Sequence, residues 1–390
     1  MGATGRIVVF GATGYTGRLV SEALVRRGAQ PVLAGRSGAR LAALAAELGS
    51  ELEIAEADMS RPESVEALIN RGDVLVSTVG PFVKVGGPAV QAAAVTGAHY
   101  IDSTGEPPFI RSVFEDHGPR AQASGAALMT AFGYDFVPGN LAGALALRDA
   151  GPGAVRVDTG YFFSAPPVAP ATPGKGPRGL DRLLAGMGGA SGGTMASLMG
   201  VLPMPSFAWR GGRLVTERSA TRVRAFDVNG TSHPGISVGG SEHLGLPQVF
   251  PELQEVNAYL GWFGPLSRAV QASSLLNAGV ARLPGSDRMF DAIASRFKTS
   301  TGGPDAEARA ATGSLITART YDASGRELSR VVLRGVNGYT FTGEIMAWAA
   351  MQAAAGGLKG SGALGPVGAF GLDELEDGCS AAGLSRVVDA

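Results

Sequence analysis

Short runs of apolar, often β-branched residues recur along the first third of the chain. They predict strands over residues 6–10, 31–34, 52–55, 74–79, 100–102 and 126–130. Between them lie Ala- and Leu-rich segments whose apolar residues return every three or four positions, as in helices. Strands this short and apolar, alternating with helices, are typical of a parallel sheet buried on both faces. The pattern predicts an α/β, doubly wound domain of the Rossmann type over residues 1–131.

The alternation then ends, and a different pattern predicts a second domain of the α+β class. A helix is expected over residues 137–150, and strand patterns follow at 155–164, 314–321 and 326–334. Asp322-Ala-Ser-Gly325 separates the last two strands and is a strong hairpin signal. These elements indicate an antiparallel sheet within residues 132–343. Helical patterns return near the end of the chain, at 345–355 and 372–382.

Two segments of the middle region have an unusual composition. Five prolines between Pro166 and Pro177 mark a long loop, which is either a lid or interdomain arm or a plain surface excursion. No charged residue occurs from Leu183 to Trp209, but glycines and prolines interrupt this stretch. We expect a buried helix or the wall of an apolar pocket there, not a membrane span. The aromatic and Met candidates for such a pocket, or for ordinary core packing, are Met195, Met199, Trp209, Trp262 and Phe263.

Composition excludes several classes of function. The chain has 390 residues and a net charge of −1, so it lacks the excess of positive charge that is typical of proteins binding nucleic acid or an anionic membrane. Its lone Cys379 excludes an internal disulfide and a Cys-rich zinc site. None of the four histidines forms a pair with metal-ligand spacing, so no metal is expected. The N-terminus has no pattern of a secretory signal, and we expect a cytoplasmic protein without a transmembrane segment.

The strongest chemical signal is Gly11-Ala-Thr-Gly14-Tyr-Thr-Gly17, which follows the first predicted strand and opens the first helix. Glycine lets the backbone approach a pyrophosphate, and the helix N-terminus presents free N–H groups to that anion. In this position the motif predicts a dinucleotide site; a glycine-rich turn without a ligand is the alternative. The predicted cofactor-binding residues of the loop are Gly11, Thr13, Gly14, Tyr15, Thr16 and Gly17.

The end of the second strand selects the dinucleotide. An acidic residue there holds the ribose hydroxyl of NAD, whereas an arginine meets the 2′-phosphate of NADP. Arg36 and Ser37 occupy this position, and the sequence places no acid near that strand end. The chain is therefore predicted to bind NADP(H); the alternative is a surface arginine that pairs with Glu47 or with water.

Further cofactor contacts are expected at the carboxyl ends of the third and fourth strands. Asp58 is interpreted either as an acceptor for the adenine amino group or as a helix N-cap. The segment that follows the fourth strand should border the nicotinamide ribose, because ligands of doubly wound sheets sit outside the carboxyl ends of the strands. Its candidate residues are Thr78, Val79, Gly80 and Pro81. Lys84 falls near the expected active site and is either a proton donor or a solvent-exposed side chain.

Candidate catalytic residues are few. No tyrosine has a lysine four residues later, which removes the Tyr-Lys acid pair of classical short-chain dehydrogenases. Tyr134 and Asp135 follow the sixth strand, where a proton donor or a hydrogen bond to the substrate is expected, and Asp135 could instead cap the helix over 137–150. The proton is expected from Tyr134 or Lys84, with bound water as the alternative. Asp102 and Glu106 flank the end of the fifth strand; they either orient the nicotinamide amide or satisfy backbone N–H groups of the turn.

Motifs along nearly the whole chain resemble those of the saccharopine dehydrogenase-like oxidoreductases, which include the trans-acting enoyl reductases of polyketide-lipid biosynthesis. The resemblance is carried by the glycine-rich loop, Ala34-Gly-Arg-Ser37, Gly80-Pro-Phe82, Tyr100-Ile-Asp-Ser-Thr-Gly-Glu106, Gly133-Tyr-Asp-Phe-Val-Pro138, Ser191-Gly-Gly-Thr194, Gly338-Tyr-Thr-Phe-Thr342 and a Gly-rich turn and helix near Gly365–Gly383. The N-terminal motifs are specific to the broad family, and the later ones are looser.

The resemblance implies an NADP-binding Rossmann domain, a second domain that covers the nicotinamide, and a C-terminal segment, 344–390, that packs back on the first domain. The chain departs from relatives at Phe136, where a Ser is frequent, and at Gly139-Asn140, where a Ser-Asp pair is common. These changes make the expected site more apolar and argue against an amino-acid substrate.

These observations together predict an NADPH-dependent reductase of a C=C (enoyl) or C=N bond in a largely apolar small molecule of polyketide, lipid or secondary metabolism. The second domain is expected to serve substrate binding and a homodimer contact. The alternative is a dinucleotide-binding sensor or scaffold without turnover, because a fold alone does not establish an activity.

Overall fold

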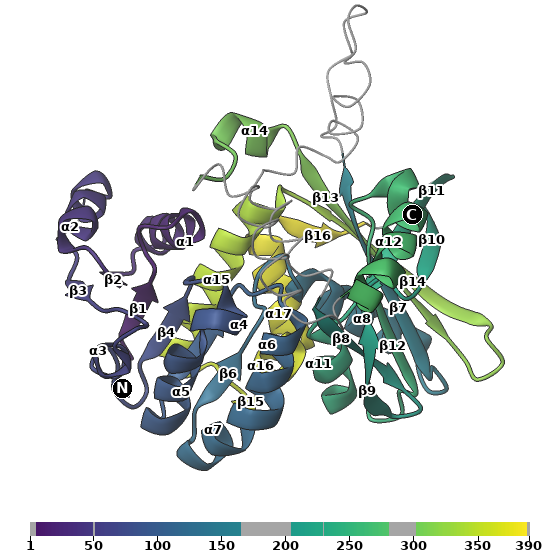
Figure 1. Cartoon of the computed structure of the whole chain (residues 1–390), viewed down its shortest axis with the longest axis horizontal. Helices are drawn as coiled ribbons and strands as arrows, with labels where there is room; N and C mark the ends of the chain where they lie inside the picture. Colours follow the sequence, from purple (N-terminus) through teal and green to yellow (C-terminus); the bar gives the residue numbers. More distant parts are fainter. Residues whose placement is uncertain (1–4, 50, 165–203, 229, 281–301, 388–390) are drawn as a thin grey trace, which may run out of the picture. The chain divides into compact units, whose positions relative to one another are not determined.

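Figure 1 shows a computed structural model of the chain, which describes residues 5–49, 51–164, 204–228, 230–280 and 302–387. The chain forms two compact units. Unit 1 combines residues 1–141, 240–250 and 338–383, and unit 2 combines residues 142–239, 251–337 and 384–390. The sequence suggested three consecutive domains, 1–131, 132–343 and 344–390, and this division stays a prediction. The two units divide the chain differently, because the chain returns to unit 1 twice, at residues 240–250 and 338–383.

Unit 1 is built on a seven-stranded parallel sheet with the order β15-β6-β5-β4-β1-β2-β3. Its strands are β1 (Ile7–Phe10), β2 (Val32–Gly35), β3 (Ile54–Glu56), β4 (Val74–Ser77), β5 (His99–Asp102), β6 (Ala127–Met129) and β15 (Gly362–Ala363). The chain leaves β1 toward β2 and β3 and then crosses to β4 on the other side. The predicted doubly wound, Rossmann-type sheet is therefore confirmed, and its topological switch point lies between β1 and β4.

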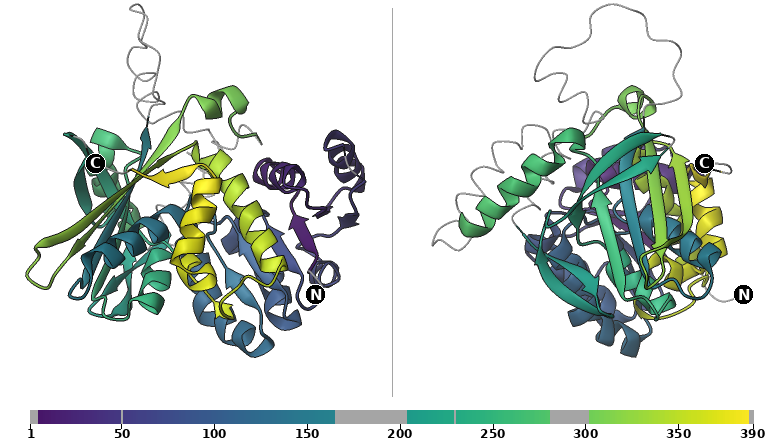
Figure 2. Two further views of the ribbon diagram at one scale, coloured as in Figure 1. Left: turned by 180° about the vertical axis from the view of Figure 1, so that it is seen from behind. Right: turned by 90° about the vertical axis from the view of Figure 1, so that its right-hand side faces the viewer.

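Helices cover both faces of this sheet. They are α1 (Tyr15–Arg26), α2 (Gly38–Glu47), α3 (Pro62–Glu66), α4 (Phe82–Val85), α5 (Gly87–Thr96), α6 (Pro107–Ser112), α7 (Gly118–Ser124), α11 (Glu242–Val249), α15 (Gly338–Ala354), α16 (Pro366–Phe370) and α17 (Leu372–Ala381), with a π-helical turn at Val113–His117. α1 and α15 pack side by side (Figure 2). α3, α5 and α7 form the other layer, where Leu75, Tyr100 and Leu128 of three adjacent strands join one buried cluster.

Unit 2 holds a nine-stranded sheet. Its main path is β10-β11-β12-β7-β13-β14-β16, and β8 and β9 extend it from β12. The strands are β7 (Arg156–Ser164), β8 (Pro205–Arg210), β9 (Arg213–Arg218), β10 (Val223–Val228), β11 (Thr231–Val238), β12 (Glu255–Leu260), β13 (Gly313–Tyr321), β14 (Glu327–Gly335) and β16 (Leu384–Arg386). The helices α8 (Val137–Ala150, entered from unit 1), α12 (Ser267–Val280) and α14 (Ala306–Ala310) accompany it.

The α+β class and the β13–β14 hairpin of unit 2 agree with the sequence prediction. The sheet is mixed where we expected it antiparallel, because β7 and β12 pair in parallel. These two strands are far apart in the chain, so no turn signal between them could indicate their direction. The predicted loop over 166–177, Ser191–Thr194, Met195, Met199 and most of the stretch 183–209 lie outside the described residues. Trp262 and Phe263 are both 7% exposed.

Within the described residues, no helix has the length and apolar character that a membrane crossing requires.

Candidate dinucleotide-binding site

The glycine-rich loop joins β1 to α1 in a conformation that depends on its glycines. Gly11 has φ +89°, and a Cβ at this position would lie 2.7 Å from Thr78 Oγ1 and 2.9 Å from Val79 Cγ2. A Cβ on Gly17 would lie 2.2 Å from the carbonyl oxygen of Gly11. Both positions therefore exclude a side chain, so that the loop can fold back tightly on the start of the helix.

The start of α1 is open to an anion. Its N-cap is Gly14, which is exposed and provides no side-chain cap, and the first turn contains no acidic residue. Thr13, Tyr15 and Thr16 flank this helix end and are partly exposed. The N–H groups and partial positive charge of a helix N-terminus, together with a glycine cradle, fit the pyrophosphate of a dinucleotide. These residues would hold the phosphates of NADP(H).

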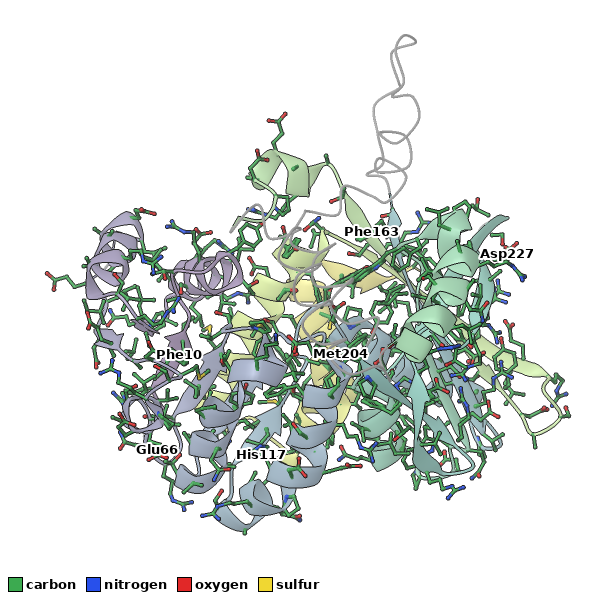
Figure 3. The ribbon with its side chains drawn as sticks, in the orientation of Figure 1. Phe10, Glu66, His117, Phe163, Met204 and Asp227 are labelled. Carbon is green, nitrogen blue, oxygen red and sulfur yellow. The ribbon has the colours of Figure 1, made fainter. Side chains whose placement is uncertain are left out.

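The segment after β4 braces the same loop. Thr78 Oγ1 donates to the carbonyl oxygens of Phe10 and Gly11, at 3.2 Å each, so the β4 exit fixes the point where β1 ends (Figure 3 labels Phe10). Val79 adds the side-chain contact to Gly11 described above. Gly80 and Pro81 then lead into α4, whose N-cap is Pro81. Thr78 and Val79 thus shape the loop, and their own contact with a cofactor stays a prediction.

Arg36 and Ser37 follow β2 directly. Arg36 is exposed, and Ser37 is the N-cap of α2 without a capping bond from its own side chain. Glu47, the partner that one alternative gave to Arg36, forms an ion pair with Arg18. The contact of Arg36 with a 2′-phosphate stays a prediction. The expectation that no acid lies near this strand end is wrong. Glu56, the last residue of β3, accepts the backbone N–H of Gly38 through Oε1 at 2.7 Å.

Asp58 has a local role in the turn after β3. Its Oδ1 accepts hydrogen bonds from Ser60 N and Ser60 Oγ, both at 2.9 Å, which holds the pKa of this carboxyl below its ordinary value. The N-cap of α3 is Arg61, so Asp58 does not cap that helix as one interpretation had it. The carboxylate stabilises an Asx turn, and its contact with adenine stays a prediction.

The segment 102–106, which begins at the last residue of β5, contacts the segments that follow β4 and β6. Asp102 is fully buried, and its Oδ1 accepts the N–H groups of Thr104 and Ala131 at 2.9 Å each. Glu106 accepts Phe82 N at 2.9 Å and Val83 N at 2.8 Å, so it binds the first turn of α4. Of the two roles expected for these acids, orienting the nicotinamide amide or accepting backbone N–H groups, the structure shows the second for both. They act as positioning residues for the flanking loops.

Asp102 also belongs to a buried polar cluster with Ser77, Tyr100 and Thr130. Within the described structure, Asp102 Oδ2 and the three hydroxyl oxygens are all buried away from solvent. Burial raises the pKa of Asp102 to about 6, and burial together with the neighbouring carboxyl raises the pKa of the Tyr100 phenol well above its ordinary value. Buried polar groups of this kind are commonly satisfied by internal water.

Asp135 lies on the loop between β6 and α8. Its Oδ1 is buried without a hydrogen bond in the described structure, and a Cβ on Gly105 would lie 3.1 Å from its Oδ2. Burial raises the pKa of this carboxyl to about 7. The capping role that the sequence allowed for Asp135 is therefore not seen, and the carboxyl is a candidate proton donor near neutral pH.

The other two catalytic candidates differ in their surroundings. Tyr134 is 7% exposed, and its N–H donates to Thr342 Oγ1 at 3.0 Å. Its ring lies against Gly338, where a Cβ would approach within 2.9 Å of the ring. Lys84 is exposed on α4, in agreement with the solvent-exposed alternative.

The first turn of α15 contributes residues that the sequence did not single out for the site. Thr342 binds the Tyr134 backbone, and the ring of Tyr339 packs edge-on against Tyr15, with centroids 5.1 Å apart at 89°. This turn therefore contacts both the start of α1 and the loop that carries Tyr134 and Asp135. The motif Gly338–Thr342 belongs to the family resemblance, but its partners are some 200 or more residues away in the chain.

Within the described residues, no group of three or more His, Cys, Asp or Glu side chains could hold a metal ion.

Comparison with known proteins agrees with this geometry. Residues 7–129 match the family model of the saccharopine dehydrogenase NADP binding domain. The whole chain shares its fold with the apo saccharopine dehydrogenase (L-Glu forming) from Saccharomyces cerevisiae, with a TM-score of 0.59 and 12% identity over 98% of this chain and 100% of that one. Residues 7–129 therefore are a saccharopine dehydrogenase-type NADP-binding domain, which confirms the resemblance inferred from the motifs, and NADP(H) is the cofactor.

Curated relatives match a shorter stretch. A trans-acting enoyl reductase of Mycobacterium leprae (strain TN) is 42% identical over 140 residues, which is 35% of this chain and 34% of the relative. One from Mycobacterium ulcerans (strain Agy99) is 39% identical over the same length and with the same coverage. The aligned part of the chain thus spans about a third of the curated relatives it matches.

We expect Arg36→Ala to weaken NADPH binding by at least about tenfold and to leave NADH affinity within about twofold. The reason is that a guanidinium–phosphate hydrogen bond contributes about 1.5–3 kcal/mol, and each 1.4 kcal/mol is about one factor of ten in affinity. Calorimetric titration of both cofactors into both proteins measures the effect. Arg120→Ala, an exposed arginine on α7, is the matched control. Equal losses for NADPH and NADH would contradict the role of Arg36.

Proposed function

We propose that the protein is an NADPH-dependent reductase that acts on the C=C (enoyl) or C=N bond of a largely apolar small molecule in polyketide, lipid or secondary metabolism. Two findings support an NADP-dependent reductase, namely the NADP-binding domain and the relatives named trans-acting enoyl reductase. The observation that carries the chemistry is the Asp135 carboxyl at the carboxyl edge of the parallel sheet. A cytoplasmic homodimer is part of the same proposal.

Such a reduction needs a hydride at one atom of the double bond and a proton at the other. NADPH supplies the hydride when bound, and the chain must supply or relay the proton. A carboxyl whose pKa is about 7 is close to half protonated at neutral pH, which is the state that a general acid needs. We assign this role to Asp135, with Tyr134 on the same loop and Lys84 on α4 as the competing donors.

The chain around Asp135 holds its loop in a fixed position. Thr342 binds the Tyr134 N–H, Asp102 binds the Ala131 N–H, and Gly105 lies directly against the Asp135 carboxyl. Asn140 is used inside the fold, where its Nδ2 donates to Phe136 O and Ser241 Oγ at 3.0 Å each. Since Phe136 is 2% exposed and Asn140 is buried, the two positions that depart from relatives serve packing in unit 1. They offer no cationic group to a carboxylate substrate.

The proposal is tested by following NADPH consumption with the purified protein and a panel of enoyl thioesters, enones, enals and cyclic imines. We expect oxidation of NADPH with members of one class, and a reduced product in equal amount by mass spectrometry. The class that reacts decides between C=C and C=N reduction. If NADPH binds but no member of the panel oxidises it, the alternative of a dinucleotide-binding sensor or scaffold is favoured.

A further inference from the structure

No acidic residue directly follows β2 in the sequence, but an acidic side chain, that of Glu56, reaches the end of β2 from the neighbouring strand β3. These strands are parallel neighbours, with Gly35 opposite Glu56, and Ala57 N donates to Gly35 O at 3.0 Å. The last residue of β3 therefore lies beside the turn that carries Arg36 and Ser37. Its carboxylate reaches the first residue of α2, where it accepts the Gly38 N–H at 2.7 Å.

This approach depends on the absence of a side chain at position 38. A Cβ on Gly38 would lie 2.4 Å from Glu56 Oε1 and 3.3 Å from its Cδ. Because the Ser37 side chain does not cap the helix, Glu56 is the acceptor for the first N–H of this ten-residue helix. The N–H groups and partial positive charge of a helix N-terminus favour one anion at this end, and a second anion next to the first is repelled.

We propose that Glu56 is a specificity-determining residue of the cofactor site, which lowers the affinity for the 2′-phosphate of NADP(H) and so narrows the preference for NADP(H) over NAD(H). The 2′-phosphate is expected beside Arg36 and Ser37, within one residue of the N–H that Glu56 accepts. The carboxylate competes with the phosphate for the same positive helix end and repels its charge. The inference rests on this placement of the phosphate and is independent of the reaction that the protein performs.

The same contact would also serve the opposite role, in which the hydrogen bond from Gly38 to Glu56 holds the turn in the shape that binds the phosphate. The two roles differ in sign. Under competition, removal of the negative charge tightens NADPH binding. Under positioning, loss of the hydrogen bond weakens it. Glu56→Gln keeps an acceptor for the Gly38 N–H and removes the charge, whereas Glu56→Ala removes both.

The experiment titrates NADPH, NADH, 2′,5′-ADP and 5′-AMP into the parent protein and both variants by calorimetry. We expect both variants to bind NADPH and 2′,5′-ADP about three- to tenfold more tightly, because a unit charge near a phosphate dianion is partly screened by water and salt. Affinity for NADH and 5′-AMP should stay within about twofold. Glu66→Gln, an exposed acid on α3 of the same unit (labelled in Figure 3), removes the same charge at another place and should change neither affinity.

An unchanged or weaker affinity for 2′,5′-ADP in Glu56→Gln overturns the proposal, and so does a gain of equal size for 5′-AMP. Weaker binding in Glu56→Ala alone would show the positioning role and overturns it as well. Since Glu56 is exposed, both variants should fold; Glu56→Gln should melt near the parent protein, and Glu56→Ala, which removes the acceptor for the Gly38 N–H, slightly below it. No substrate enters the measurement, so failure of the proposed reductase activity would leave this result unaffected.

Discussion

Asp135→Asn is expected to lower the rate of substrate reduction by about 100-fold or more at saturating NADPH, because a positioned general acid contributes about 10²–10⁴-fold. The amide has nearly the shape of the carboxyl but donates no proton, so NADPH affinity should stay within about twofold. The pH dependence has a definite sign. The protonated carboxyl is the donor and its pKa is about 7, so activity of the parent protein falls as the pH rises through 7. The Asn variant should lose this step.

The controls separate Asp135 from its neighbours. Asp116→Asn, an exposed acid on the π-helical turn before α7, carries the same chemical change away from the site and should retain full activity. Tyr134→Phe and Lys84→Met test the competing donors in the same assay. A rate for Asp135→Asn within about threefold of the parent, together with a large loss in one of the other two variants, would transfer the role of proton donor to that residue.

The parts of the fold that the sequence predicted correctly are those that local patterns determine. The six strands of the parallel sheet before residue 130 are four residues or fewer and coincide with predicted short strand patterns, so their order along the chain could be predicted. The seventh strand, β15, was not predicted, because its two residues, Gly362 and Ala363, carry no strand pattern. Helix 137–150 has the predicted bounds, and the hairpin forms around Asp322–Gly325 as its turn sequence indicates. In each case the information lies within about a dozen consecutive residues.

The parts that could not be predicted are contacts between strand ends that are distant in sequence. Glu56 reaches Gly38, and Glu106 reaches Phe82 and Val83, because parallel neighbours bring their carboxyl ends to one edge. A sequence scan for an acid near Arg36 looks along the chain and misses an acid on the adjacent strand. The same limit applies to Tyr339, whose partner Tyr15 lies at the other end of the chain.

The pKa values of the aspartates at the site could not be predicted from the sequence either. Asp58, Asp102 and Asp135 each lie at or after the carboxyl end of a strand of the same sheet, yet the pKa of the first lies below its ordinary value and those of the other two lie above it. The difference comes from burial and from hydrogen bonds. Asp58 is half-buried and accepts two bonds from Ser60, whereas Asp135 has a buried oxygen without a bond in the described structure. The candidate donor could therefore be ranked only after the fold was known.

Gly17→Ala is expected to abolish measurable cofactor binding, with an affinity loss of about 100-fold or more, or to prevent folding of unit 1. The added Cβ would lie 2.2 Å from Gly11 O and 2.9 Å from Ala12 Cα, and both atoms belong to the backbone of the loop that forms the phosphate cradle. Backbone cannot move aside as a flexible side chain can, so the loop must open or α1 must shift. Gly87→Ala is the matched control, since a Cβ there meets nothing within 4 Å and its φ is not positive. Calorimetry with NADPH, together with circular dichroism, distinguishes loss of the cradle from loss of the fold. A folded Gly17→Ala protein that binds NADPH with parental affinity would show that the glycine-rich loop does not hold the cofactor.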